Sequence, residues 1–207
     1  MENMTLQEQI RHVKLHLRGV MNGVVSQSMR EKGLTYKLNF GVDLPRLRLL
    51  ANEFPHTATL AAALWKEDIR ECRLLAAMLY PAEEYPEELA DLWIEQMKYT
   101  EEAECTVLHL FSHLPYASNK VFEWIAQEQT MFQICGWLLL GRLLSSGKYL
   151  CERDVQEIFD QMETALMNED KSVVIAAQKT LIKLMDCGPK EEKQGEKLLE
   201  KIARLKF

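Results

Sequence analysis

The chain has little of what marks a secreted, membrane-spanning or disulfide-bonded protein. Its five cysteines are an odd number without a CxxC spacing, so we expect no disulfide framework and a reducing, cytoplasmic setting. The most apolar stretch, residues 131–144, contains Gln133 and Arg142 and is shorter than the roughly 20 residues of a bilayer-spanning helix. Residues 1–4 lack the charged and apolar parts of a signal peptide. We therefore expect no contact with a membrane, and we predict that 131–144 is a buried central helix.

Signals for β-strands are also nearly absent, because the chain has no sustained two-residue alternation of apolar and polar side chains. Helical periodicity is present throughout. Three tryptophans recur at intervals of about 30 residues, each on a short amphipathic helix pattern: Trp65, Trp93 and Trp124. Three cysteines keep nearly the same interval on the helical runs that follow: Cys72, Cys105 and Cys135. A supersecondary unit that recurs at this period is typical of stacked helix hairpins.

We predict an all-α, HEAT-like or ARM-like α-α superhelix of about eleven helices, in a single domain over residues 1–207. Residues 1–54 would form N-terminal helices, 55–186 four hairpins, and 187–207 a C-terminal capping helix. The predicted hairpins pair 57–66 with 68–79, 86–97 with 100–113, 118–127 with 130–145, and 152–167 with 171–185. The second helices of these pairs contain more small and apolar residues, so we expect them to form the inner layer.

The N-terminal region shows one apolar stripe that runs from Leu6 to Val24, which predicts a single first helix. Residues 31–42 are predicted to form a loop around two glycines. Asp43 is a candidate N-cap with a proline in the first turn after it, so a second helix should begin there and end near Phe54.

The net charge of −6 is unevenly distributed along the chain. Residues 1–54 carry eight Lys or Arg and five Asp or Glu, whereas residues 55–118 carry four and twelve. Residues 119–207 carry thirteen and fourteen. The overall charge argues against strong nonspecific binding of nucleic acid, but it leaves room for local basic surfaces.

Several stretches of sequence resemble the DNA alkylation-repair family of HEAT-like repeat DNA glycosylases. Residues 36–51 resemble the opening segment of that family, with the sequence YKLNFGVDLPRLRLLA. Residues 60–65 and 70–76 resemble its first full repeat, with the sequences LAAALW and RECRLLA. Residues 124–126 and the helix that follows them also fit.

The resemblance implies a curved array of helix hairpins that holds double-stranded DNA on its concave face. It implies excision of cationic 3- or 7-alkylated purines by a carboxylate near the start of an inner helix, with aromatic residues beside the damaged nucleotide and an arginine on the next inner helix. Because the leaving base is already cationic, the enzyme must chiefly stabilise a developing oxocarbenium ion and position water. Neither a cofactor nor a metal is implied.

The chain departs from the family pattern at the catalytic positions. Residues 99–105 contain neither the expected tryptophans nor the aspartate, and Cys105 occupies the position of the aspartate. Ile134 stands where the arginine is expected, and Leu181 lies near the position of a further aromatic residue. We therefore predict a DNA-binding relative that is catalytically divergent or inactive. Glu104 is the weak candidate for a substitute carboxylate; a solvated acidic first turn, which the helix dipole favours, is the alternative.

Charged residues on the expected inner helices are the candidates for contacts with DNA: Arg70, Arg73, Lys179 and Lys183. Two further basic stripes could engage phosphates and would then bind less tightly in salt. The first helix carries Arg11, Lys14 and Arg18, and the last carries Lys190, Lys193, Lys197, Lys201 and Arg204. Glutamates run beside the last stripe, so ordinary pairing on a solvated helix is the alternative there. Arg142 is two turns from position 134, too far to replace the missing arginine, and Trp137 is either a stacking surface or part of the core.

Two histidine patterns complete the set of candidate sites. Cys105, His109 and His113 repeat at a spacing of four residues, as do His12 and His16. Neighbouring members could share a metal, but packed side chains are the alternative, and we expect no metal site. Catalysis by a Cys105–His109 pair would need a third orienting group that the sequence does not supply. The rival function is a protein-interaction scaffold for a basic partner, which the acidic segment 55–118 and the absent catalytic residues favour.

Overall fold

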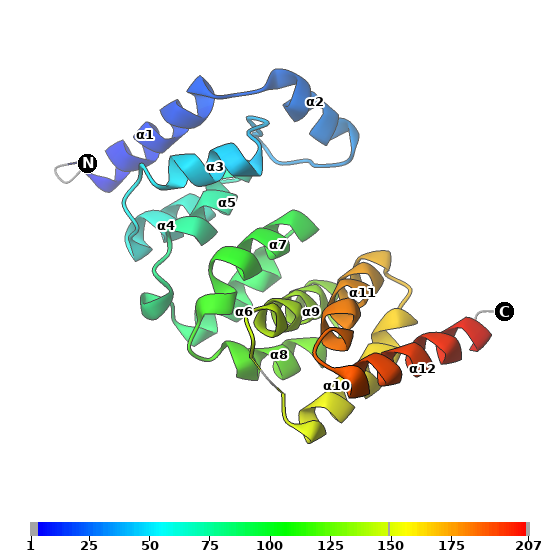
Figure 1. Ribbon diagram of the computed structural model, residues 1–207. Helices are drawn as coiled ribbons and strands as arrows, with labels where there is room; N and C mark the ends of the chain where they lie inside the picture. The colour runs from blue at the N-terminus through cyan, green and yellow to red at the C-terminus, as the bar shows by residue number, and fades with distance from the viewer. Residues whose placement is uncertain (1–3, 149, 206–207) are drawn as a thin grey trace. The chain divides into compact units, whose positions relative to one another are not determined.

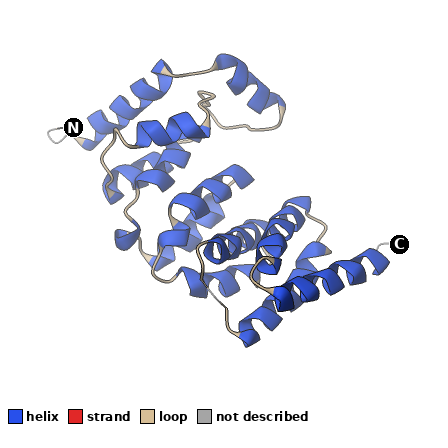
Figure 2. Cartoon of the chain, in the orientation of Figure 1, coloured by secondary structure: helices blue, strands red, loops and turns tan. Residues whose placement is uncertain are grey.

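The computed structural model describes residues 4–148 and 150–205. These residues form twelve α-helices, two short 3-10 turns and no named β-strand (Figure 2). The all-α prediction is therefore confirmed. The helices fall into two compact units, residues 1–86 and 87–207. The assignment of the whole chain to one domain stays a prediction.

The first unit contains five helices and a 3-10 turn (Figure 1). Their bounds are α1 (Leu6–Gly19), α2 (Gly23–Glu31), α3 (Leu44–Ala51), α4 (Ala58–Trp65), α5 (Arg70–Leu79) and η1 (Ala82–Glu84). Helices α4 and α5 form a hairpin, and α1 and α3 pack on it. Polar side chains begin four of these helices by accepting a hydrogen bond from a backbone N–H in the first turn: Thr5, Asn22, Asp43 and Thr57. The predicted N-cap at Asp43 is therefore confirmed.

The prediction of one continuous first helix was wrong. Helix α1 ends at Gly19, and Asn22 caps a separate helix α2. Val24, which the sequence placed on the buried stripe, is 80% exposed. The break has a tertiary cause, because the backbone N–H of Asn22 donates to the carbonyl of Phe40, 2.8 Å away.

The loop over residues 36–42 is seated on the start of α5. The backbone N–H of Leu38 donates to Asp68 O, and that of Arg70 donates to Leu38 O. Gly41 has a φ of +71°, and a Cβ at this position would lie 2.6 Å from the backbone nitrogen of Ser26. A side chain would therefore clash with α2 as well as strain the backbone, so the loop and α2 fit together only with glycine here.

The second unit contains seven helices and one 3-10 turn. Their bounds are α6 (Glu87–Gln96), α7 (Thr100–His109), η2 (Phe111–His113), α8 (Ala117–Ile125), α9 (Thr130–Ser145), α10 (Glu152–Leu166), α11 (Lys171–Met185) and α12 (Pro189–Leu205). Helix α9 packs against α7 on one side and α11 on the other (Figure 1). Helix α8 packs on α9, α10 packs on α11, and α12 contacts both α10 and α11. The three second helices α7, α9 and α11 therefore form one layer.

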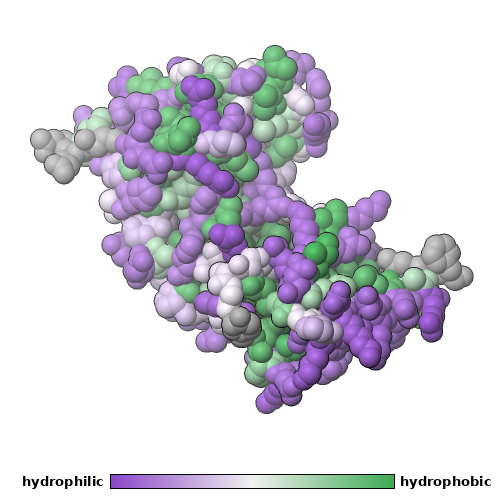
Figure 3. All heavy atoms as spheres, viewed as in Figure 1, coloured by the Kyte–Doolittle hydropathy of each residue, from purple (hydrophilic) through white to green (hydrophobic). Residues whose placement is uncertain are grey.

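Helix α9 is the centre of this unit, as its apolar sequence predicted. Trp137 is 1% exposed, so it belongs to the core. Two glycines let neighbouring helices approach closely. A Cβ at Gly136 would lie 2.8 Å from the backbone nitrogen of Ile125 in α8, and one at Gly141 would lie 3.0 Å from Oγ1 of Thr180 in α11. Helix α12 covers the end of the unit, and Figure 3 shows hydrophilic side chains over its exposed side.

Candidate nucleic-acid interface

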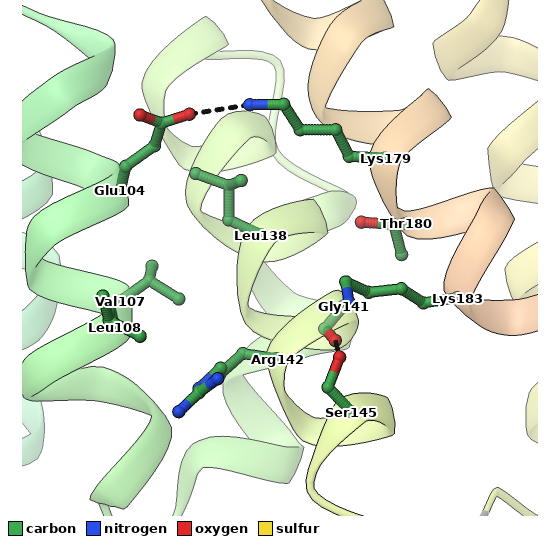
Figure 4. Close-up of a pocket in the computed structure, with 10 residues that line it drawn as sticks. All are labelled: Glu104, Val107, Leu108, Leu138, Gly141, Arg142, Ser145, Lys179, Thr180 and Lys183. Atoms are coloured by element: carbon green, nitrogen blue, oxygen red, sulfur yellow. Dashed lines mark hydrogen bonds and ion pairs between the residues drawn. The ribbon is translucent and has the colours of Figure 1, made fainter.

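A cavity of about 240 Å³ lies among α7, α9 and α11. Its apolar wall comes from Val107, Leu108, Leu138 and Gly141. Its charged lining residues are Glu104 from α7, Arg142 from α9, and Lys179 and Lys183 from α11 (Figure 4). The structure therefore brings together the weak carboxylate candidate and two of the four predicted DNA contacts, and it adds one arginine.

Lys179 and Glu104 form an ion pair across the cavity. The Lys179 Nζ lies 2.8 Å from the Glu104 Oε1, and Figure 4 shows the lysine reaching from α11 towards α7. The two side chains are 56% and 46% exposed. An ion pair in such contact with water contributes little to stability, about 0–1 kcal/mol. The pair is therefore easily broken by a competing ion.

Arg142 and Lys183 carry the other two positive charges of the cavity. Both residues are exposed, and within the described parts of the chain neither side chain makes an ion pair. Three cations and one carboxylate leave the cavity with a formal charge of about +2, in a protein whose net charge is −6. This excess of positive charge favours the binding of an anion in the cavity.

The packing of α9 against α11 positions these cations. Oγ1 of Thr180 donates to the carbonyl oxygens of Trp137 at 2.6 Å and Ala176 at 3.0 Å, so a buried hydroxyl fixes the two helices. Lys179 and Lys183 are one turn apart on α11 and lie on the same side of it. The aliphatic part of the Lys183 side chain lies beside Gly141 of α9. A Cβ at Gly141 would lie 3.4 Å from the Cδ of Lys183.

The other two predicted DNA contacts occupy buried positions in the first unit. Arg70 is 2% exposed, and its Nη1 donates to Val42 O at 2.9 Å and to Glu71 Oε1 at 3.1 Å. Arg73 is 6% exposed and stacks on the Trp65 ring, with its guanidinium carbon 4.3 Å from the ring centroid. Both arginines thus make their contacts within the first unit, and neither lines the cavity.

The sequence matches the sequence model of the DNA alkylation repair enzyme family over residues 13–194. This chain belongs to that family. A solved structure is also similar, with a TM-score of 0.83 and 14% sequence identity over 92% of this chain and 81% of the other. That structure is described as a new family of proteins related to the HEAT-like repeat DNA glycosylases with affinity for branched DNA structures. No curated protein matches the chain.

The similarity to this structure confirms the predicted HEAT-like fold. The three residues that we predict to stand at the family's catalytic positions are all buried here. Cys105 is 5% exposed, Ile134 is 1% exposed and Leu181 is 3% exposed. These side chains present no carboxylate, guanidinium or aromatic face to a substrate, and buried Trp137 does not supply one.

Two buried carboxylates were not singled out from the sequence. Glu71 is 0% exposed and accepts hydrogen bonds from the backbone N–H groups of Phe40 at 3.0 Å and Val42 at 3.2 Å. Glu102 is also 0% exposed, and it accepts from the backbone N–H groups of Lys98 at 2.7 Å and Tyr99 at 3.3 Å. An acidic residue in the first turn of an inner helix was the available signal. Glu71 thus fixes the loop that precedes α3, whereas Glu102 fixes the residues that lead into its own helix, α7.

The basic stripes are partly neutralised. On α1, Lys14 pairs with Glu67 at 2.8 Å. On α12, Lys190 and Lys201 pair with glutamates of α10, and Arg204 pairs with Glu200. These pairs agree with the interpretation of α12 as a solvated helix.

The histidine patterns contribute to packing. The rings of His12 and His16 lie with their centroids 4.2 Å apart, and the His16 ring lies edge-on to Phe54 at 5.6 Å. Helix α7 ends at His109, so His113 lies in the following 3-10 turn and the three-residue pattern does not continue on one helix. Across residues 4–148 and 150–205, no three His, Cys, Asp or Glu side chains gather as a metal site would require. No helix in these ranges is both long and apolar enough to cross a bilayer.

Proposed function

We propose that this member of the DNA alkylation repair family binds double-stranded DNA through its phosphate backbone and does not excise alkylated bases. Arg142, Lys179 and Lys183 are the proposed backbone contacts. The gathering of these three cations around one cavity on the inner layer carries the proposal. The affinity for branched DNA attributed to the similar structure supports the inclusion of branched substrates among those tested.

The absence of excision is proposed from the burial of the three family positions. Release of a cationic purine requires a negative charge held close to the developing oxocarbenium ion. A neutral thiol at position 105, which is 5% exposed, neither carries this charge nor reaches the substrate. Glu104 remains as the carboxylate of the cavity, where in the free protein it pairs with Lys179 in contact with water. We therefore expect no release of N3- or N7-methylpurine from alkylated DNA.

A titration of labelled duplex and branched DNA at two salt concentrations tests the binding proposal. Two to three phosphate contacts predict a loss of affinity of roughly 10- to 40-fold between about 50 and 200 mM salt. Arg142→Gln and Lys183→Gln should each weaken binding and reduce the salt slope by about 0.9. Lys66→Gln removes an exposed lysine at the end of α4, outside the cavity and outside both basic stripes, and is the matched control. Absence of binding to either DNA at low salt would discard the proposal.

The rival function is a scaffold for a basic protein, and an acidic surface of α6 and α8 supports it. Lys120 is 5% exposed and lies within salt-bridge distance of three carboxylates that are 40–53% exposed: Glu87, Asp91 and Glu123. One buried ammonium leaves this cluster with a net negative charge. The scaffold predicts no affinity for DNA and binding of a Lys-rich peptide that Glu87→Gln weakens.

A further inference from the structure

The ion pair between Glu104 and Lys179 joins residues that are 75 positions apart in sequence, at the edge of the cationic cavity (Figure 4). We propose that this pair is an electrostatic gate on DNA binding. In the free protein Glu104 occupies Lys179, and a DNA phosphate that enters the cavity competes with Glu104 for the same ammonium group. The inference rests on the proposed function and assigns Glu104 a regulatory role in place of a catalytic one.

The geometry places Glu104 where a bound phosphate would meet it. Lys183 follows Lys179 by one turn of α11, a rise of about 6 Å along the helix axis. A phosphate held by Lys183 and Arg142 would therefore share the cavity with the Glu104 carboxylate. Two negative charges in one small cavity repel each other, and salt weakens this repulsion. Glu104 thus opposes binding in two ways, by repelling the phosphate and by holding the third cation.

The exposure of the Glu104–Lys179 pair to water determines how strongly Glu104 opposes DNA binding. Because the two side chains are 56% and 46% exposed, water screens their attraction and a phosphate can displace the carboxylate. Glu104→Gln removes the negative charge and frees Lys179 with little change in shape. The gain from both effects should tighten DNA binding roughly three- to tenfold. Because Lys179 contacts the phosphate more fully without Glu104, the salt slope should also steepen by up to about 0.9.

A matched substitution separates this gate from a simple change in net charge. Glu152 on α10 pairs with Lys190 on α12 at 3.1 Å, and both side chains are highly exposed, but neither lines the cavity. Glu152→Gln changes the net charge as Glu104→Gln does and also frees a lysine. It should leave DNA affinity within about twofold of the wild type, because its charge is not beside the proposed phosphate.

The test is a titration of labelled duplex DNA with four proteins: wild type, Glu104→Gln, Lys179→Gln and the double variant. We expect Glu104→Gln to bind more tightly with a steeper salt slope. Loss of Lys179 should cost more affinity in the Glu104→Gln background than in the wild type, because in the wild type DNA must first displace Glu104 from Lys179. Circular dichroism melting curves check that all four proteins are folded.

Two results would overturn the gate while leaving DNA binding intact. The first is a Glu104→Gln variant that binds no more tightly than the wild type, and the second is an equal gain for Glu152→Gln. Absence of DNA binding by both the wild type and Glu104→Gln would instead overturn the proposed function. A catalytic role for Glu104 predicts a different pattern, in which Glu104→Gln abolishes base release and leaves affinity unchanged.

Discussion

Removal of the Glu71 carboxylate should destabilise the first unit more than any exposed charge change. Glu71 is 0% exposed, and its oxygens accept hydrogen bonds from two backbone N–H groups of the 36–42 loop and from Arg70. Glu71→Ala leaves both N–H groups without this acceptor, and it removes the carboxylate that pairs with the guanidinium of Arg70, which is 2% exposed. Breaking a buried ion pair costs about 3–5 kcal/mol, and each buried polar group left unsatisfied about 1–3 kcal/mol.

These costs overlap because they concern the same carboxylate, so we expect a loss of about 3–5 kcal/mol in the free energy of unfolding. Glu71→Gln keeps one acceptor oxygen and should lose less. Urea unfolding followed by circular dichroism measures the difference. The control is Glu67→Ala, which removes a carboxylate that is 30% exposed and pairs with Lys14, and which should cost less than about 1 kcal/mol.

The same variant makes a local prediction about the loop. Lys37 is exposed and lies next to the segment that Glu71 holds. If Glu71 fixes the loop, trypsin should cut Glu71→Ala after Lys37 faster than it cuts the wild type. A Glu71→Ala protein within about 1 kcal/mol of the wild type, with unchanged cleavage at Lys37, would refute the reasoning.

Three further predictions concern packing, thiols and charge. Gly136→Ala should lower stability by about 1–3 kcal/mol, because its Cβ would press on the α8 backbone. Gly19→Ala is the control, with nothing within 4 Å of the new Cβ, and should not destabilise the protein. The melting temperatures of the two variants test this difference. A thiol reagent at pH 8 should modify exposed Cys151 quickly but should modify Cys72 only after the protein unfolds. Cys72 is buried, and burial raises its pKa to about 12. Rapid labelling of Cys72 in the folded protein would contradict its burial. Lys120→Met should cost about 1–3 kcal/mol, because three carboxylates lose their shared cation. Burial tends to lower the pKa of Lys120, but hydrogen bonds to the carboxylates raise it above 10.5. The stability that Lys120 contributes is therefore complete below pH 10.5 and declines above it. A difference in unfolding free energy between wild type and Lys120→Met that stays constant above this pH would contradict the raised pKa.

The helices of the second unit were largely predictable because their signals are local. Residues 130–145 and 171–185 were predicted, and α9 and α11 have these bounds. The failure at the N-terminus has a tertiary cause. The apolar stripe continues through Val20 and Val24, and the chain nevertheless breaks, because Asn22 bonds to the distant Phe40 carbonyl. Periodicity within one helix does not report a hydrogen bond between segments 18 residues apart.

The candidate site was predictable only in part, because the sequence does not show which charged side chains are buried and which are exposed. Lys179 and Arg70 show the same pattern, a cation on an apolar inner helix, yet one is exposed and the other is paired in the core. The difference arises from Glu71 and the loop that covers it. Arg142 was set aside because it lies two turns from position 134. Arg142 instead shares the cavity with Lys179 and Lys183 of a neighbouring helix, and this arrangement depends on the close approach of α9 and α11 at Gly141.

Backbone binding and base excision make different demands on the positions of charges. A cation attracts a phosphate over several ångströms, so Arg142, Lys179 and Lys183 can act from any turn of α9 and α11 that faces the cavity. Excision needs a carboxylate placed about 3–3.5 Å from the reacting carbon, and a misplacement of about 1 Å is already costly. Cys105, Ile134 and Leu181 fill the core at the positions that would supply this geometry, and a charge placed there would have to be desolvated. Cations at the edge of the cavity carry no such cost, because water still reaches them. The cations that we propose to bind DNA thus lie in contact with water, whereas Cys105, Ile134 and Leu181 are buried, and this difference is the physical basis for proposing binding without chemistry.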